Sequence, residues 1–350
     1  MILDNEKSWF ESPGCAVWEL TLACNLNCLH CGSSAGKARP NELSTKDAIK
    51  LCRDLAEIGT HEVCLMGGEP LIRKDWYEIA KEIRNLGMKL SIISNGFNIN
   101  NEIISKFKKL DPHAISTSLD GAKAETHDKI RGAKGSFDQV MRYLKLSREA
   151  NLPTSAITTV SKLNFKELPD IKDILFDRLI AWQIQTASPI GRFPKNLVLS
   201  NEEFYSLGLF IANLKQKYPS KQMPVIGAHC FGYFSKNIPN IAIYPEWRGC
   251  QAGISIIGIQ SDGGIKGCLS TPDEYIEGNI RKKSIIDFWN DPNSFSYNRN
   301  FKNEDLGPLC INCKYGEKCK GGCMSTSAAF TGKPHNSPYC FYRYEEKKGL

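Results

Sequence analysis

Short runs of strand-forming residues alternate with amphipathic stretches through the first two-thirds of the chain. The runs predict six strands, at 16–22, 62–66, 89–94, 114–119, 154–160 and 181–186. The helical stretches predict helices that begin near Ser44 and cover 76–86, 103–107, 137–150, 166–176 and 201–218. Six β-then-α units indicate a parallel sheet, either open and doubly wound or closed into an incomplete barrel. In both folds the chemistry collects at the carboxyl ends of the strands.

The pattern changes after about residue 219. Gly, Pro, Asn and Cys become frequent, helical periodicity is sparse apart from 284–290, and eight of the fourteen cysteines lie beyond residue 229. A segment with so little regular structure needs cross-links, and bound metal is the natural candidate. We therefore expect two domains, an α/β domain over 1–218 and a small, irregular, Cys-rich domain over 219–350.

The composition excludes several classes of protein. With 41% hydrophobic and 24% charged residues the 350-residue chain is typical of a globular protein, and its apolar runs are too short to span a bilayer. Residues 1–11 lack the features of a signal peptide, so we expect a cytoplasmic protein whose reduced thiols are available as metal ligands. The net charge of +7 is scattered along the chain, which favours neither nucleic acid nor a membrane as a partner.

Three cysteines, Cys24, Cys28 and Cys31, follow the first predicted strand in a C-x3-C-x2-C spacing. Three thiolates can hold three irons of a [4Fe–4S] cluster and leave the fourth iron open to a substrate. From the spacing alone, a zinc site with His30 as its fourth ligand or a group of structural thiols also fits.

The triple, with His30 immediately before its last cysteine, resembles the signature of the radical S-adenosylmethionine (SAM) enzymes. The resemblance extends over the predicted sheet and implies a partial (β/α)6 barrel of the TIM type. It also implies SAM as a cofactor, contacted by Gly67, Gly68 and Glu69 after the second strand, with Glu69 paired to the methionine ammonium. Three further side chains would lie near the ribose and carboxylate of SAM: Ser94, Ser118 and Arg131. Each of these polar residues could instead cap a strand or a helix.

The C-terminal cysteines form a second set with a longer pattern. Its seven members are Cys250, Cys268, Cys310, Cys313, Cys319, Cys323 and Cys340. The pattern resembles the SPASM extension of peptide-maturing radical SAM enzymes, which implies two auxiliary [4Fe–4S] clusters. By this resemblance one cluster is held by Cys310, Cys313, Cys319 and Cys340, and the other by Cys250, Cys268 and Cys323. Structural zinc sites are the alternative, because C-x2-C pairs also bind zinc.

The cluster of Cys250, Cys268 and Cys323 lacks a fourth ligand in this pattern. Family members that have one carry it a few residues before the position of Cys250, whereas the nearest cysteine here, Cys230, lies twenty residues upstream beside His229. The options are a Cys230 ligand, a His229 ligand or an iron open to substrate, and we favour Cys230.

Cys15, Cys52 and Cys64 lie outside both sets. The helical pattern around Cys52 indicates a buried position. Cys64 lies on the second predicted strand and faces either the barrel interior or the outer helices. In the first case its thiol could return a hydrogen atom to a substrate radical, and no other catalytic residue is indicated.

The resemblance implies an oxidoreductase that cleaves SAM reductively to a 5′-deoxyadenosyl radical, which abstracts a hydrogen atom from the substrate. Two auxiliary clusters favour an oxidative product such as a crosslink, because a nearby cluster can accept the second electron. We expect a ribosomally synthesised peptide as substrate and a flavodoxin- or ferredoxin-type electron donor. About fifteen residues precede the first strand, too few for a leader-binding domain, so we expect either a separate leader-binding protein or direct docking of the peptide.

Three alternatives remain open. A redox-neutral reaction such as epimerisation needs a hydrogen donor in place of an electron acceptor. The run from Cys28 to Gly36, followed by Glu42 and Leu43, is similar to members that act on tetrapyrrole side chains. An electron carrier or a zinc-stabilised binding module would not cleave SAM, and the Gly-Gly-Glu motif argues against both.

Overall fold

The computed structural model describes residues 12–231, 234–242 and 246–350. Its centre is a ten-stranded sheet in the order β10-β9-β8-β1-β2-β3-β4-β5-β6-β7. The strands are β1 (Cys15–Thr21), β2 (Glu62–Gly67), β3 (Lys89–Ser94), β4 (Ala114–Ser118), β5 (Thr154–Val160), β6 (Ala181–Thr186), β7 (Val225–Gly227), β8 (Ile256–Ile259), β9 (Gly264–Lys266) and β10 (Gly278–Asn279). Neighbours from β8 through β1 to β7 pair in parallel, and β9 and β10 extend the edge in antiparallel pairing.

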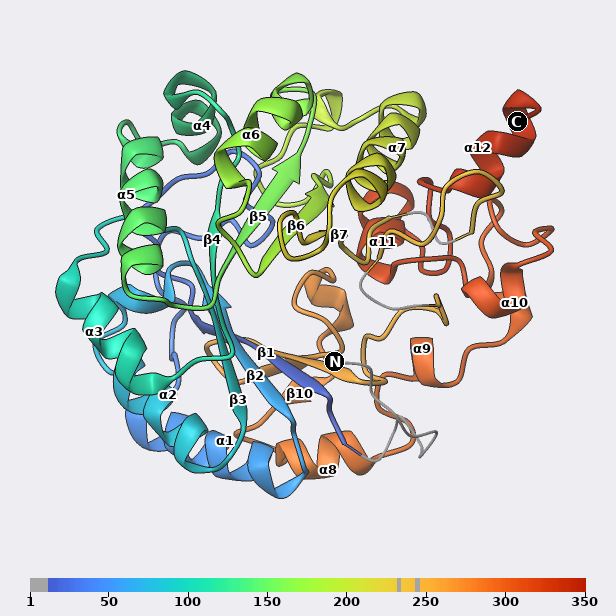
Figure 1. The fold of residues 1–350 in the computed structure, drawn as a ribbon. Helices are drawn as coiled ribbons and strands as arrows, with labels where there is room; N and C mark the ends of the chain where they lie inside the picture. The colour runs from blue at the N-terminus through green and yellow to red at the C-terminus, as the bar shows by residue number, and fades with distance from the viewer. Residues whose placement is uncertain (1–11, 232–233, 243–245) are drawn as a thin grey trace.

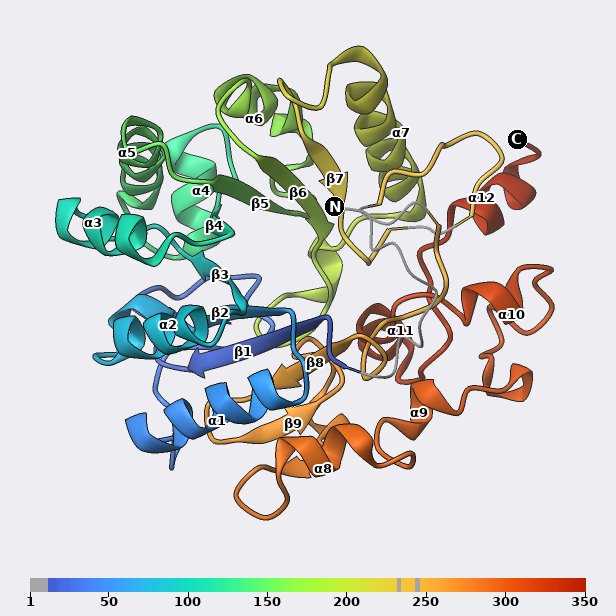
Figure 2. The same cartoon turned by 60° about the horizontal axis from the view of Figure 1, so that its bottom comes forward.

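Helices follow most of the parallel strands and cover the outer face of the sheet (Figure 1). They are α1 (Thr45–Glu57), α2 (Trp76–Asn85), α3 (Asn101–Leu110), α4 (Ala124–Arg131), α5 (Ser136–Glu149), α6 (Leu168–Leu175) and α7 (Asn201–Lys217). Short helices occupy the C-terminal part: α8 (Ile285–Asn290), α9 (Ser296–Arg299), α10 (Gly316–Cys319), α11 (Met324–Thr331) and α12 (Phe341–Lys348). The sheet curls into a partial barrel, and its open side faces the C-terminal segment around α11 (Figure 2).

The incomplete barrel is confirmed, and the open doubly wound alternative is not. The predicted strands at 89–94, 154–160 and 181–186 match the observed bounds, and the other three differ by one residue at an end or at both. The predicted cap of α1 is also present: the Ser44 hydroxyl accepts from the Asp47 amide at 3.2 Å, and Asp47 accepts from the Ser44 amide at 3.3 Å. The sequence did not reveal α4, nor β7 to β10, which are only two to four residues long.

The two faces of the sheet differ in chemistry, because alternate residues of a strand point to opposite faces. On β1, Ala16, Trp18 and Leu20 are buried in a core beneath the helices. The opposite, inner face of the barrel is half-buried, and the residues placed there by alternation include the polar Ser116, Ser118, Thr159, Gln183 and Gln185, beside the apolar Val17, Met66, Ile93 and Ile157. Hydroxyl and amide groups therefore line part of the inside of the barrel.

The C-terminal part shares its core with the barrel. Ile285, Phe288 and Trp289 of α8 belong to the same buried cluster as Trp18. Phe341 of α12 lies in a second buried cluster with residues of α7. The division into domains at residue 218 stays a proposal, and the observed sheet continues beyond it through β7 and β8.

The sequence predicted neither a signal peptide nor a membrane-spanning segment. Residues 1–11, which carry no signal-peptide pattern, lie outside the described residues. Among the residues that are described, none of the helices is both long and apolar enough to cross a membrane.

Candidate active site

The loop after β1 carries Cys24, Cys28 and Cys31 at the carboxyl edge of the sheet. Backbone amides donate to two of the sulfurs: Leu26 to Cys24 Sγ at 3.4 Å and Ala35 to Cys31 Sγ at 3.3 Å. All three thiols act on one another electrostatically, so they lie close together. Hydrogen bonds to sulfur stabilise the thiolate form that binds iron, and this donor set therefore fits an iron–sulfur cluster.

A second loop, between β6 and α7, holds the cysteine loop in place. The Arg192 guanidinium donates to the carbonyls of Cys28 at 3.0 Å and Ala35 at 2.8 Å. Gly191 lies so close that a Cβ there would be 2.2 Å from the Cys31 carbonyl oxygen. Neither residue could be predicted from the sequence, because both follow the loop by about 160 positions and lie in an irregular segment.

Gly67 and Gly68 bring the end of β2 against the same cysteine loop. Gly67 has φ 139°, and a Cβ there would lie 2.3 Å from the Thr21 carbonyl oxygen. A Cβ at Gly68 would lie 2.1 Å from the Ala23 carbonyl oxygen, which accepts from the Glu69 amide at 2.8 Å. Both glycines thus admit the backbone of the cysteine loop, and their contact with SAM stays a prediction.

Gly68→Ala should push the cysteine loop away from β2. Overpacking of this kind costs about 1–3 kcal/mol, so we expect a lower melting temperature and less iron per chain in anaerobically purified protein. Gly36→Ala is the matched control, because a Cβ at Gly36 in the same loop meets nothing within 4 Å. Equal iron content and stability in the two variants would contradict the role of Gly68.

Glu69 is buried at the end of β2 and tied to β3. Its carboxylate accepts from the backbone amides of Asn95 at 2.7 Å and Leu71 at 3.1 Å. Burial raises the pKa of Glu69 to about 7 despite these hydrogen bonds. The Asn95 side chain also approaches Cys24 Sγ at 3.9 Å, so Asn95 links the glutamate to the cysteine loop. This role of Asn95 could not be predicted from the sequence.

Arg131, at the end of α4, is buried beside the cysteine loop. Its Nη1 donates to Asp120 at 3.1 Å, and its guanidinium is acted on by Cys24 and Cys28. Its buried Nε has no hydrogen-bond partner among the described residues. A buried donor without a partner is costly, and the carboxylate of a bound ligand would satisfy it. This orphaned donor fits SAM, as do the cysteine thiols nearby.

Asp120, directly after β4, joins three parts of the site. Its carboxylate contacts His30 of the cysteine loop at 2.9 Å and Arg131 at 3.1 Å, and it accepts from the Thr159 amide of β5 at 2.8 Å. Burial opposes its ionisation, but the charges of His30 and Arg131 outweigh burial and hold the pKa of Asp120 below its usual value. No role for Asp120 was predicted from the sequence.

The two serines lie at the same edge. Ser94 is buried at the end of β3, where its hydroxyl accepts from the Gly96 amide at 3.1 Å and interacts with Glu69. Ser118 is half-buried at the end of β4, two residues before Asp120. The structure thus gathers the expected SAM-contacting residues at the carboxyl ends of β2, β3 and β4.

Cys64 lies on the inner face of the barrel. Its neighbours Val63 and Leu65 are buried in the core beneath the helices, so the strand alternation directs Cys64 to the inside. Burial, with a smaller contribution from Glu62, raises the pKa of the Cys64 thiol to about 12. The side chain therefore keeps its proton at neutral pH. Cys52 is fully buried on α1, as expected.

The first C-terminal cysteine group gathers at the open side of the barrel. Cys250 forms a hydrogen bond with Cys323, which also acts electrostatically on Cys268 and Cys230. Cys230 Sγ accepts from the Thr186 amide, at the end of β6, at 3.3 Å. His229 beside it is exposed. The structure thus brings Cys230 to the other three cysteines despite the twenty-residue separation.

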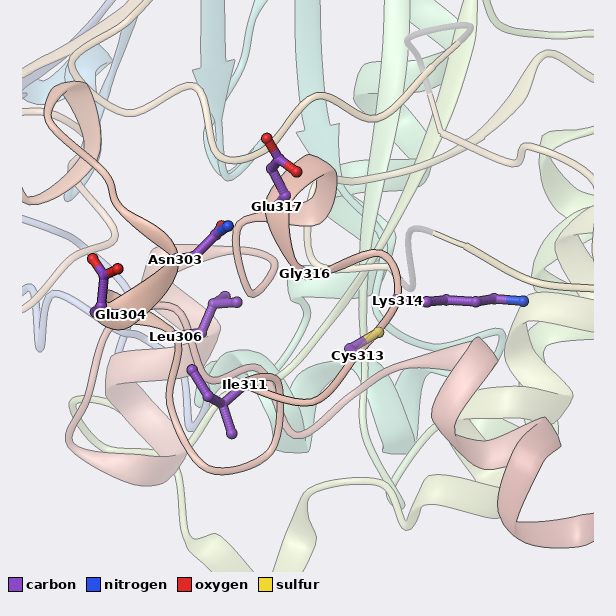
Figure 3. A pocket seen from close by; sticks show the side chains of 8 residues that line it. All are labelled: Asn303, Glu304, Leu306, Ile311, Cys313, Lys314, Gly316 and Glu317. Atoms are coloured by element: carbon purple, nitrogen blue, oxygen red, sulfur yellow. The ribbon is translucent and has the colours of Figure 1, made fainter.

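The second C-terminal group consists of the four cysteines expected together, because their thiols act on one another: Cys310, Cys313, Cys319 and Cys340. A pocket of about 380 Å³ on the surface beside Cys313 is lined in part by Leu306, Ile311 and Lys314 (Figure 3). Within the described part of the chain, no three His, Cys, Asp or Glu side chains are placed to hold a single metal ion.

The sequence model of the radical SAM superfamily matches residues 18–175, and that of an iron–sulfur cluster-binding domain, SPASM, matches 250–314. The Fe-coproporphyrin III synthase of Methanosarcina barkeri is 31% identical, over 94% of this chain and 88% of that protein. The chain belongs to the radical SAM superfamily and carries a SPASM region. It is a radical SAM enzyme, which implies SAM and iron–sulfur clusters as its cofactors.

Two further relatives and one solved structure are similar to this radical SAM enzyme over most of its length. The AdoMet-dependent heme synthase of Methanosarcina barkeri is 29% identical over 96% of this chain and 98% of its own length. The mycofactocin maturase MftC of Mycolicibacterium smegmatis is 29% identical over 94% and 82%. The crystal structure of Streptococcus suis SuiB has a TM-score of 0.73 at 19% identity, covering 95% of this chain and 76% of SuiB. That likeness confirms the fold, a partial barrel with a Cys-rich C-terminal region.

Proposed function

We propose that this radical SAM enzyme oxidises a ribosomally synthesised peptide, which loses one hydrogen atom to the radical, a second electron to the auxiliary clusters and a proton to the solvent. The observation that carries the proposal is the set of hydroxyl and amide groups on the inner face of the barrel. Ser116 and Ser155 share a hydrogen bond of 2.6 Å across β4 and β5, and Gln185 donates to Thr159 at 2.9 Å. Hydroxyl and amide groups can exchange these bonds for the backbone of a peptide.

The residues that would hold the cofactors follow from the site. Cys24, Cys28 and Cys31 would bind the cluster that chelates SAM, and the bound pair supplies the radical that abstracts hydrogen. The chain's own groups bind and orient SAM: Glu69 would meet the amino group, Arg131 Nε the carboxylate, and Ser94 and Ser118 would lie near the ribose or carboxylate. Gly67 and Gly68 hold the cysteine loop against β2, which fixes the cluster relative to the inner face.

We assign two auxiliary clusters, to Cys310, Cys313, Cys319 and Cys340, and to Cys250, Cys268, Cys323 and Cys230. The Thr186 amide supports Cys230 as the fourth ligand: burial raises the pKa of this thiol to about 11, and the hydrogen bond to Sγ acts in the opposite direction, towards the thiolate. Anaerobically purified protein should then contain about twelve irons and negligible zinc per chain. Elemental analysis tests this, and about four irons with one or two zincs would overturn the assignment.

Cys230→Ala tests the fourth ligand by the spectrum of the cluster. We expect this variant to lose or alter the electron paramagnetic resonance (EPR) signal of the cluster at Cys250, Cys268 and Cys323. The signals of the SAM-binding cluster and of the other auxiliary cluster should remain. His229→Ala should leave all the signals unchanged, because Cys230 then still supplies the fourth thiolate. An unchanged spectrum for Cys230→Ala would favour an open iron site.

A second candidate substrate is a tetrapyrrole, since the heme synthase and Fe-coproporphyrin III synthase relatives match nearly end to end. Glu42, which contributed to the similarity to tetrapyrrole-modifying members, does not favour a tetrapyrrole substrate. Glu42 accepts from Thr21, Leu22 and Arg39, so it holds the cysteine loop together. A tetrapyrrole presents a broad apolar ring with carboxylates only at its rim, whereas the hydroxyl and amide groups of the inner face match a peptide backbone better.

One experiment separates the two substrates. The anaerobic enzyme with SAM and a low-potential reductant is incubated with iron coproporphyrin III, or with peptides translated from short reading frames beside its gene. We expect 5′-deoxyadenosine to rise above the substrate-free rate only with a peptide, whose mass falls by two hydrogens. Stimulation by the porphyrin alone would overturn the peptide assignment. A peptide whose mass is unchanged in ordinary water and rises by one in deuterium oxide would show epimerisation, for which Cys64 is the candidate hydrogen donor.

A further inference from the structure

A buried phenol lies beside the first C-terminal cysteine group. Tyr297 of α9 packs with Cys268 against a small buried cluster that contains Cys250 and Met324. Its hydroxyl lies over the backbone before Cys268, so close that a Cβ on Gly267 would be 2.2 Å from the phenol oxygen. Cys250 and Cys268 both act electrostatically on this phenol. The hydroxyl therefore sits among the thiols proposed to hold an auxiliary cluster.

The Gly267 amide faces the phenol oxygen, but the hydroxyl proton has no acceptor among the described residues, although the group is shielded from solvent. A buried hydroxyl whose proton has no acceptor is costly, and native structures seldom leave one unused. A cluster bound to the neighbouring cysteines would supply what is missing, because thiolate and sulfide sulfurs accept hydrogen bonds.

The backbone around Tyr297 is firmly held. The next residue, Asn298, is fully buried and donates to the carbonyls of Cys250 and Ala252, both at 2.7 Å. His335 contacts the Tyr297 carbonyl at 2.7 Å through one ring nitrogen and the carbonyl of Lys320, directly after Cys319, through the other at 2.6 Å. These contacts fix the phenol relative to Cys250 and tie it to the loop of the second cysteine group.

We propose that the Tyr297 hydroxyl donates a hydrogen bond to the auxiliary cluster of Cys250, Cys268 and Cys323 and raises its reduction potential. The inference rests on the proposed cluster assignment. Reduction adds negative charge to the cluster, and a donor aimed at its sulfurs stabilises the reduced form. Tyr297 is thus a positioning residue that makes this cluster the better electron acceptor in the oxidation.

The test compares a Tyr297→Phe protein with one that keeps Tyr297, in an anaerobic, EPR-monitored redox titration of the cluster-loaded chain. Both carry the replacements Cys24→Ala, Cys28→Ala and Cys31→Ala, so that the auxiliary clusters alone give signals. We expect Tyr297→Phe to keep its iron and to shift the midpoint of one auxiliary cluster to a more negative potential. Its electron–nuclear double resonance spectrum should show one exchangeable proton coupling fewer after transfer to deuterium oxide.

Tyr275→Phe is the matched control. The Tyr275 ring packs edge-on against Tyr297 at 5.1 Å between centroids, and the charge that acts on its phenol is that of Glu274. Removal of the Tyr275 hydroxyl should leave the midpoint potentials of both auxiliary clusters unchanged. Auxiliary signals with an unshifted midpoint in Tyr297→Phe would overturn the role of Tyr297 alone. Protein without auxiliary signals, holding zinc, would overturn the cluster assignment and the inference with it.

Discussion

Cys28→Ala is expected to abolish SAM cleavage and to remove about four irons per chain. Cys28 lies between the other two thiols of the C-x3-C-x2-C loop and acts electrostatically on both. Two remaining thiolates cannot hold a cluster with one open iron, so no site is left at which SAM can be chelated and reduced. Iron analysis and liquid chromatography of 5′-deoxyadenosine, under anaerobic conditions with a low-potential reductant, measure the two losses.

Cys52→Ala is the control for this prediction, because it also removes a buried thiol. Cys52 packs in the core on α1, away from the cysteine loop. We expect it to lower the free energy of unfolding by about 1 kcal/mol and to keep both the iron and the SAM cleavage. If Cys28→Ala behaved like Cys52→Ala, the loop cysteines would be structural thiols. Retained cleavage with zinc in place of iron would equally contradict the radical mechanism.

The features that the sequence predicted well are those encoded over short stretches. The three strands with matching bounds are dense in β-forming residues and lie between clear turn signals. The cap of α1 is encoded within four residues, Ser44 to Asp47. The loop cysteines could be grouped because only a few residues separate them.

The features that were missed depend on contacts between distant residues. Asp120 meets His30 across 90 positions, and Arg192 reaches Cys28 across 164. No local pattern encodes such contacts, because the register of a parallel sheet decides which strand ends meet. Cys230 is an intermediate case: its residue type suggested a ligand, but only the pairing of β6 with β7 brings it beside Thr186.

Asp120→Ala is expected to destabilise the enzyme more than other single replacements at the SAM edge. The replacement leaves the buried Arg131 guanidinium without its counter-charge and frees His30 and the Thr159 amide. Removing one partner of a buried ion pair costs about 3–5 kcal/mol. Thermal unfolding of the cluster-loaded protein, followed by circular dichroism without oxygen, should show a melting temperature several degrees lower. The affinity for SAM should fall at least tenfold, about 1.4 kcal/mol, because Arg131 loses its orientation.

A double-mutant cycle distinguishes this ion pair from simple loss of packing. Arg131→Met alone leaves the Asp120 carboxylate buried and without its cation, and it should also be destabilising. In the double variant Asp120→Ala with Arg131→Met neither charge remains, so its loss of stability should be smaller than the sum of the two single losses. Strictly additive losses would show that the two residues act independently. In that case the Nη1 contact at 3.1 Å would not be what holds Arg131 in place, and its unpartnered Nε would no longer indicate the ligand carboxylate.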